Sequence, residues 1–222
     1  MLLFIIVLSL PAVQTKLAEK LTDYLQETYD TAITIDKIGL NWRAEVDARG
    51  VYIADHHQDT LIYGNQLQTN ILSFAKLIKG DVGFGNIKLS EAKFYVKTYK
   101  GEDTDNLTIF ADKFDSGTQG TSTFLLYGND VEIVNSQIKI IDENLSTPIL
   151  FNLSKVNASA ENFKVVGPEV FADVTSINLS AARGFDIKDL KADFSYTRKE
   201  MTLKDLELQT AQTHLVLSLI HI

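Results

Sequence analysis

The chain has 222 residues, of which 45% are hydrophobic and 23% are charged, a composition typical of a folded protein rather than a disordered one. Its net charge of -8 argues against nucleic acid as a partner, because phosphate binding needs clustered lysine and arginine. The absence of cysteine excludes disulfide bonds, thiolate metal sites and thiolate nucleophiles.

Residues 1–11 are an apolar run that ends at Pro11. A transmembrane helix needs about 20 apolar residues, so this run has about half the required length. A secretory signal and a buried helix are alternatives. A secretory signal, however, requires lysine or arginine before its apolar core, and this chain has neither there. We interpret the run as a partial transmembrane anchor whose beginning is missing. Its membrane residues are Leu2, Leu3, Phe4, Ile5, Ile6, Val7, Leu8 and Leu10.

Residues 12–29 follow a different pattern, with Val13, Leu17, Leu21 and Leu25 at every fourth position and charged residues between them. This spacing predicts an amphipathic helix. Proline suits the first turn of a helix, so a new helix beginning after Pro11 is expected. The helix is predicted to cap a sheet, to lie at a membrane surface, or to do both.

From residue 30 onwards the apolar period falls to two, which is typical of β-strands. Residues 30–100 are expected to form strands joined by a polar hairpin turn at 55–59. A helical spacing in "NILSFAKLIKG", which ends at Gly80, predicts one short helix near 70–79.

Residues 101–120 are polar and predict a long loop, with one strand around 107–110. Residues 121–216 alternate again and predict further strands, with a turn at 135–136. The segment "DIKDLKADF" is echoed by "TLKDLELQT" 16 residues later, about one strand-turn-strand step. The echo favours one elongated, repetitive sheet, although chance repetition of strand composition is an alternative.

The motifs of common enzymes are missing from the sequence. It contains no nucleophile elbow, no phosphate-binding glycine loop and no HExxH pattern, so we predict a protein that is not an enzyme and has no catalytic residues, metal or cofactor. His56 and His57, with Asp55 and Asp59 beside them, would suit a metal. A solvated turn is favoured, because adjacent residues on a strand point to opposite faces. Chance accounts for five Asn-x-Ser/Thr sequons, at Asn106, Asn144, Asn152, Asn157 and Asn178.

The order of these parts resembles a known family. The segments "LPAVQTKLAEKLTDYLQETYDTAITIDKIGLNW" and "GVYIADHHQDTLIYGNQLQTNILSFAKLIKGDVGFGNIKLSEAKFYV" look like the amino-terminal region of the AsmA-like / TamB family (translocation and assembly module). The resemblance covers residues 1–100 well. The later strands resemble the family only in their general strand pattern. Its individual motifs are loose, and it is carried by their order: anchor, proline, helix, strand pair, turn, short helix and strand.

The resemblance implies a single-pass protein of the cell inner membrane with its bulk in the periplasm. It implies a mainly β fold with an N-terminal helix: an elongated antiparallel sheet forming an open, taco-like groove, capped by the amphipathic helix and one further short helix. Family members are linked to phospholipid transport between the inner and outer membranes, and TamB to outer-membrane protein assembly and secretion with an Omp85-class barrel.

An acyl-chain groove needs one apolar face, which alternating strands at 121–216 supply without any catalytic group. The same alternation would also serve a closed core, so both interpretations stay open. The lipid-groove candidates are Ile87, Leu89, Val131, Ile133, Ile138, Ile140, Ile177, Leu179, Phe185 and Ile187.

Three functions are therefore expected as alternatives: a phospholipid bridge, a scaffold for outer-membrane protein assembly, and a repetitive surface protein or adhesin. Residues 217–222, "LSLIHI", match the in-frame translation of a common sequencing adapter. We interpret them as an adapter-derived tail and expect the natural chain to continue past Val216.

Overall fold

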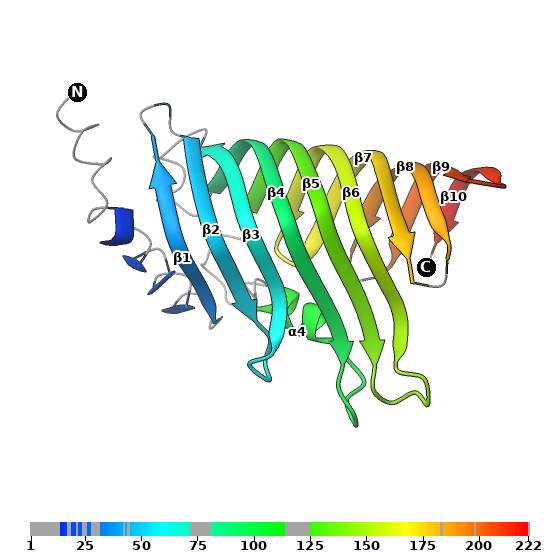
Figure 1. The fold of residues 1–222 in the computed structure, drawn as a ribbon, viewed down its shortest axis with the longest axis horizontal. Helices are drawn as coiled ribbons and strands as arrows, with labels where there is room; N and C mark the ends of the chain where they lie inside the picture. The colour runs from blue at the N-terminus through cyan, green and yellow to red at the C-terminus, as the bar shows by residue number, and fades with distance from the viewer. Residues whose placement is uncertain are drawn as a thin grey trace.

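The computed structural model describes residues 14–16, 19–20, 22–23, 26–27, 32–41, 43, 45–71, 81–113, 125–182, 184–197 and 199–221. These residues form one open ten-stranded sheet, accompanied by helical residues within 14–27 and by the helix α4 (Figure 1). The strands lie in sequence order, so every strand contacts the strands before and after it in the chain.

The elements have the following bounds: β1 (Ile33–Leu40), β2 (Glu45–Ala54), β3 (Thr60–Ile71), β4 (Asp81–Thr98), α4 (Asn106–Asp112), β5 (Leu125–Asp142), β6 (Ile149–Val166), β7 (Glu169–Ala181), β8 (Asp186–Tyr196), β9 (Met201–Thr210) and β10 (His214–His221).

The sheet is mixed, which corrects the expectation of a purely antiparallel one. β4 pairs with β5 in parallel, from Asp81 opposite Leu125 to Thr98 opposite Asp142, and the other strand pairs are antiparallel. A parallel pair needs a long crossover connection. The chain between β4 and β5, which includes α4, provides this crossover.

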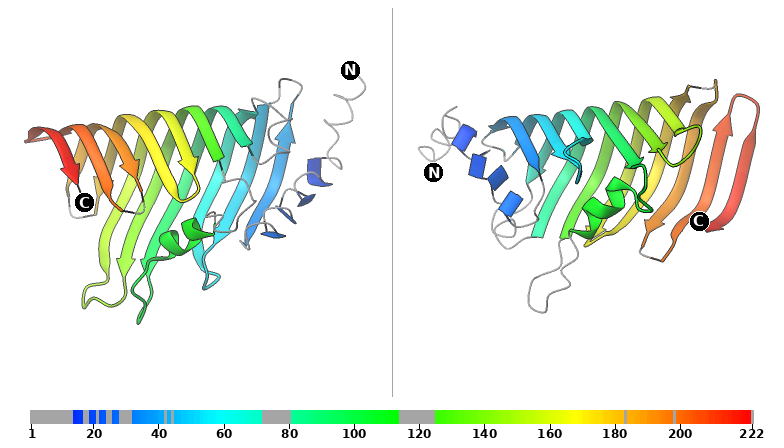
Figure 2. Two further views of the ribbon diagram at one scale, coloured as in Figure 1. Left: turned by 180° about the vertical axis from the view of Figure 1, so that it is seen from behind. Right: turned by 90° about the horizontal axis from the view of Figure 1, so that it is seen from below.

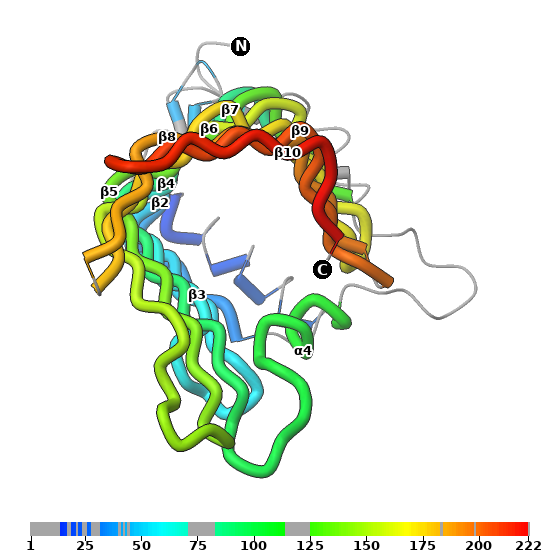
Figure 3. Tube along the Cα trace, turned by 90° about the vertical axis from the view of Figure 1, so that its right-hand side faces the viewer, coloured from blue at the N-terminus to red at the C-terminus, as the bar shows by residue number. Residues whose placement is uncertain are grey.

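The sheet is curved, so that one face is concave along the long axis of the molecule (Figure 3). Several strands contain a residue with positive φ near their middle, among them Gly50 (φ 60), Glu91 (φ 52) and Asn135 (φ 47). The register places Glu91 and Asn135 at matching positions, between the pairs Ser90–Val134 and Lys93–Gln137. We call this line of kinks across neighbouring strands the crease.

Small side chains occupy the inner side of the crease. Ala92 is 1% exposed and Ser136 is 2% exposed, and the Ser136 hydroxyl accepts a hydrogen bond from the Ala92 N–H at 3.0 Å. Gly64 pairs with Ala92, and a Cβ at Gly64 would lie 2.9 Å from Leu89 Cδ1. Larger side chains would crowd the inner side of the bend, so small residues allow the curvature.

Polar side chains occupy the outer side of the crease. The Asn65 amide donates to Glu91 Oε2 at 2.9 Å, and the Asn157 amide donates to Asn178 Oδ1 at 3.0 Å. The Asn135 backbone N–H donates to Asn157 Oδ1 at 2.9 Å. These bonds tie successive strands together at the point where each changes direction.

Several sequence predictions are confirmed. Residues 55–59 form the hairpin turn between β2 and β3, and the described residues within 14–27 are helical, as the amphipathic pattern predicted. The proposed anchor residues 2–10 lie outside the described residues. In the described part of the chain, no helix combines the length and the apolar character needed to cross a membrane.

Other predictions were wrong. Residues 107–110 form part of α4 instead of a strand, because Asp105 caps this helix and accepts a hydrogen bond from the Thr108 N–H at 2.9 Å. The expected turn at 135–136 is the crease inside β5, which continues through it. Residues 70–71 belong to β3, and the remainder of the helix expected near 70–79 lies outside the described residues. β6 lies within the range 121–216, where strands were expected, and residues 217–221 belong to β10.

Candidate functional site

The concave face carries continuous apolar rows that cross the strands. The longest runs through β1 to β7 by direct pairing, and its members are Ile38, Ala48, Leu67, Leu89, Ile133, Ala158 and Ile177. Directly opposed residues point to the same face of a sheet, so this row lies on one face. Because the row contains the buried Ile38 and Ala48 and has the small crease residues beside it, that face is the concave one.

Two further rows flank the first on the same face. One lies beyond the crease and consists of Ile53, Ile62, Phe94, Ile138, Leu153 and Ala181. The other is apolar apart from Thr69 and consists of Val46, Thr69, Ile87, Val131, Ala160, Val174 and Ala192. We call these three rows together the apolar concave face.

The structure brings most of the ten groove candidates together on this face. Five of them belong to the rows just described. Ile87 pairs directly with Val131, and Leu89 pairs directly with Ile133. Ile177 lies in the same row as Ile133, with Ala158 between them. Ile138 belongs to the row beyond the crease, and Ile140 follows two positions later on β5, opposite Val96 and Phe151.

The remaining three candidates lie near the β7–β8 connection. Leu179 pairs directly with Ile187, two positions along β7 from Ile177. Phe185 precedes β8, and its side chain is 51% exposed, so it lies outside the paired rows. The other nine candidates are neither fully buried nor fully exposed. No second sheet lies over these strands among the described residues, which leaves their apolar side chains partly accessible.

Sequence reasoning missed part of this face. Leu67, Phe94 and Leu153 lie in the same rows as the candidates but were not selected. Leu153 belongs to β6, where the positive φ of Lys155 and Asn162 interrupts the alternation of apolar residues. In a regular strand, apolar residues on one face are two positions apart. A spacing of three positions across a polar residue, as from Leu89 to Ala92, could have located these kinks.

The convex face is polar. Lys88, between two concave-face residues on β4, forms an ion pair with Glu132 at 2.9 Å. The ammonium groups of Lys93 and Lys139 lie 5.8 and 5.3 Å from the ring centres of Tyr63 and Tyr95. The sheet therefore separates an apolar face from a charged and hydrated one, as alternating strands with one buried face do.

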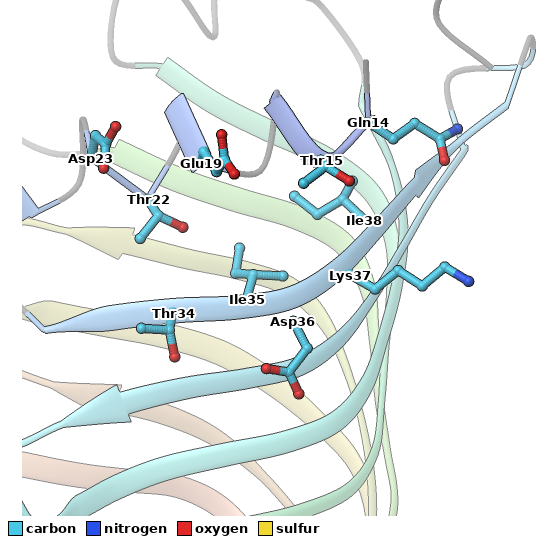
Figure 4. A pocket seen from close by; sticks show the side chains of 10 residues that line it. All are labelled: Gln14, Thr15, Glu19, Thr22, Asp23, Thr34, Ile35, Asp36, Lys37 and Ile38. Carbon is cyan, nitrogen blue, oxygen red and sulfur yellow. The ribbon is translucent and has the colours of Figure 1, made fainter. Parts of the chain in front are cut away.

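The helical residues within 14–27 lie beside β1, at one end of the sheet (Figure 2). A pocket of ≈ 340 Å³ separates them from β1, and Ile35 and Ile38 point into it toward Thr15, Glu19 and Thr22 (Figure 4). The Gln26 amide donates to the Ile33 carbonyl at 3.0 Å, at the outer edge of the sheet. These residues therefore cover the β1 edge, which would otherwise be free.

A polar network lies at the edge of the sheet that carries the β2–β3, β4–α4 and β5–β6 connections, which we call the lower rim. Asn106 is completely buried and takes the place of a strand residue beside β4. Its side chain accepts from the Lys97 N–H at 2.8 Å and donates to the Tyr95 carbonyl at 3.1 Å and to Asp55 Oδ2 at 2.8 Å. The sequon at Asn106 is therefore hidden in the folded chain.

Asp55 and Tyr99 complete the network. The Tyr99 hydroxyl lies 2.7 Å from Asp55 Oδ2 and 2.9 Å from Asp59 Oδ2. Burial and the two neighbouring carboxylates raise the pKa of Tyr99, which stays neutral. Burial alone would raise the pKa of Asp55, but hydrogen bonds from Asn106, Tyr99 and two backbone N–H groups outweigh it and lower that pKa.

A scan against protein-family models finds no match for this chain, and no curated protein matches it.

Proposed function

We propose that the chain is a segment of an inner-membrane-anchored periplasmic bridge, in which the apolar concave face forms a taco-like groove that carries phospholipid between the inner and outer membranes. The observation that supports this most directly is the continuity of the longest apolar row across seven strands on one open face. The resemblance of residues 1–100 to the AsmA-like / TamB family points to the same function.

The physical argument rests on how acyl chains bind. Burying a methylene group contributes about 0.8 kcal/mol and has no directional requirement. A long apolar surface can therefore hold an acyl chain at many positions of similar energy, which allows movement along it. The polar convex face would keep such a segment soluble in the periplasm, while the lipid headgroup stays in water at the open side.

The helical residues beside β1 fit this proposal as a cap at the membrane-proximal end. They are amphipathic, and they follow the apolar run that we interpret as an anchor. Their position over the β1 edge would place the start of the groove where a lipid leaves the inner membrane.

A second candidate function is a scaffold for outer-membrane protein assembly with an Omp85-class barrel. In such a scaffold, exposed strand edges would pair with client strands by β-augmentation. Photo-crosslinkers placed along strand edges would then capture client proteins whether or not lipid is present.

The bridge proposal is tested by lipid transfer. The full chain is purified, its bound lipid is analysed by mass spectrometry, and the transfer of a labelled phospholipid between donor and acceptor vesicles is measured. We expect co-purified phospholipid and accelerated transfer. Ile133→Asp places a charge in the longest row and is expected to reduce transfer by more than about tenfold, because a carboxylate in apolar surroundings is strongly unfavourable.

The matched control is Val134→Asp, the same change at the next residue of β5, on the convex face. It should leave transfer unchanged. A folded protein without bound lipid or transfer activity would refute the bridge, and equal losses in both variants would show that the effect comes from stability.

A further inference from the structure

A group of metal-ligand side chains lies at the lower rim, away from the apolar concave face. His56 Nε2 lies 2.9 Å from one carboxylate oxygen of Glu102, and His57 Nε2 lies 2.7 Å from the other. The nearest ligand atoms of the three residues all lie within 4.8 Å of one another. The two histidines are adjacent in the chain, but they occupy a turn rather than a strand, so both rings can face the same carboxylate.

The turn holds the two rings in place without help from Glu102. Asp55 Oδ1 accepts hydrogen bonds from the N–H groups of His57 and Asp59, both at 2.9 Å, which fixes the backbone of the turn. The His57 ring lies against the Tyr99 ring with centres 3.9 Å apart, and the His56 ring meets the same ring edge-on at 5.5 Å. Tyr99 is itself bonded to Asp55.

Glu102 is held from its own side of the rim. Its N–H donates to the Tyr99 carbonyl at 3.0 Å, and its carbonyl accepts from the Asn144 amide at 2.9 Å. The three side chains therefore come from two connections, β2–β3 and β4–α4, that are positioned by separate hydrogen bonds. Such support is what a metal site requires of the residues around its ligands.

We propose that His56, His57 and Glu102 bind a divalent transition-metal ion of the zinc class. Two imidazole nitrogens and one carboxylate oxygen are a common zinc ligand set, with bonds of about 2.0–2.2 Å. Ligand atoms around a tetrahedral zinc ion lie about 3.4 Å apart, so small rotations of the three side chains would admit the ion. Imidazole ligands disfavour calcium and magnesium, which prefer oxygen.

The surroundings suit a cation. Two neutral imidazoles and one carboxylate leave a bound divalent ion with one excess positive charge, and the carboxylates of Asp55 and Asp59 lie at the hydroxyl of Tyr99, whose ring supports the site. Lys97 lies over the Tyr99 ring at 4.0 Å, and its ammonium group is paired with Glu143 at 2.9 Å and with Asp59 at 3.7 Å.

The ion would act as a clasp between the turn at 55–59 and the connection after β4. His57 and Glu102 are 45 positions apart in the chain, so the clasp would close a long loop at the lower rim. Three protein ligands leave a fourth tetrahedral position, and the partial exposure of the three side chains leaves that position open to water or an anionic oxygen.

Zinc titration of the full chain tests this inference. After chelator treatment and dialysis, isothermal titration calorimetry should show one saturable zinc site, and zinc should raise the thermal unfolding temperature until a chelator is added. His56→Gln, His57→Gln and Glu102→Gln should each weaken zinc binding by more than about tenfold, because two ligands remain of three. Magnesium should not bind.

His214→Gln is the matched control, because His214 pairs with a single carboxylate, Glu207, at 3.6 Å. It should bind zinc like the unaltered chain. Absence of saturable zinc binding, or unchanged affinity in the His57→Gln protein, would overturn the inference. Unfolding curves in the presence of the chelator check that each variant is folded. The readout does not involve lipid, so its failure is separate from failure of the bridge proposal.

Discussion

Asn106 joins three parts of the lower rim. Its side chain satisfies the backbone of β4 beyond the end of β3 and also binds Asp55 in the β2–β3 turn. Sequence reasoning treated it as a sequon in a polar loop. Its importance comes from contacts with residues 9 to 51 positions away, which local sequence patterns do not report.

Asn106→Ala is expected to lower the free energy of unfolding by about 3 kcal/mol. The change leaves buried polar groups on Lys97, Tyr95 and Asp55 without their partner, and each such group costs about 1–3 kcal/mol. Urea unfolding followed by circular dichroism measures the difference. Leu107→Ala, at an exposed position of the same helix, should change stability by less than about 0.5 kcal/mol. Equal effects of the two changes would contradict the role of Asn106.

The ionisation of Asp55 is expected to account for part of the loss of stability at low pH. Its pKa in the folded chain lies below the ordinary value of 3.8, so its ionised form stabilises the fold at higher pH. This contribution is complete above about pH 3.8 and is lost as the pH falls through the lowered pKa. Glu102 and Glu143, whose pKa values are lowered mainly by hydrogen bonds from His57 and Lys97, act in the same direction.

Asp55→Asn separates the contribution of Asp55 from theirs. Unfolding free energies measured between pH 6 and pH 2.5 should fall less steeply in this variant than in the unaltered chain, because one of the groups that gain protons on acid unfolding is gone. A parallel pH profile in the two proteins would show that the carboxylate of Asp55 does not contribute.

Among the elements, the long strands β4, β5 and β6 determine the curvature through their positive-φ residues. Glu91, Asn135, Lys155 and Asn162 each adopt a conformation that glycine or asparagine tolerates best. At the crease, the kink changes which residues face inward, from odd-numbered ones such as Leu89 to even-numbered ones such as Phe94 on β4. Both halves of the strand therefore present apolar residues to the concave face. A strand without the kink would turn half of them outward.

Asn135→Val tests the crease directly. A β-branched residue at φ 47 should cost roughly 1–2 kcal/mol of stability, whereas Asn135→Gly should be nearly neutral. Asp130→Val, in the regular and exposed part of the same strand, is the control and should lie within about 0.5 kcal/mol of the unaltered chain. Chemical denaturation provides the values. A stable Asn135→Val protein would mean that β5 can bend without this conformation.

At the scale of the whole molecule, the decisive property is that the longest apolar row extends from β1 to β7 without interruption. The sheet remains open, and no second sheet covers the concave face among the described residues. Side chains that would fill a closed core in a sandwich are therefore left partly exposed. The proposed passage of lipid depends on this continuity rather than on any single residue.

Photo-crosslinking along one row tests this continuity. A crosslinking amino acid placed singly at Leu67, Ile133 or Ile177 should form phospholipid adducts at all three positions, because they belong to the same row. The same amino acid at Lys88 or Glu132, on the convex face, should form none. Mass spectrometry of the products detects the adducts. Adducts at Leu67 alone would indicate a closed pocket near β1 instead of a passage.

Local sequence patterns were sufficient to predict the mainly β class, the hairpin turn at 55–59 and most of the apolar face. These features follow from local rules: a period of two places Ile87 and Leu89, or Ile177 and Leu179, on one side of a strand whatever the neighbours are. The helical character of the described residues within 14–27 also followed from local spacing.

The way in which these elements combine depends on long-range contacts. The parallel pairing of β4 with β5 depends on the path of the crossover connection, which sets where β5 begins. Leu107 is helical because Asp105 caps α4 and Asn106 is fixed at the lower rim. The kinks at Glu91 and Asn135 align because the strands pair in one register. His56 and His57 converge on Glu102 because a turn, unlike a strand, lets adjacent side chains face the same way. These outcomes rest on contacts between residues far apart in the chain, to which local periodicity is insensitive.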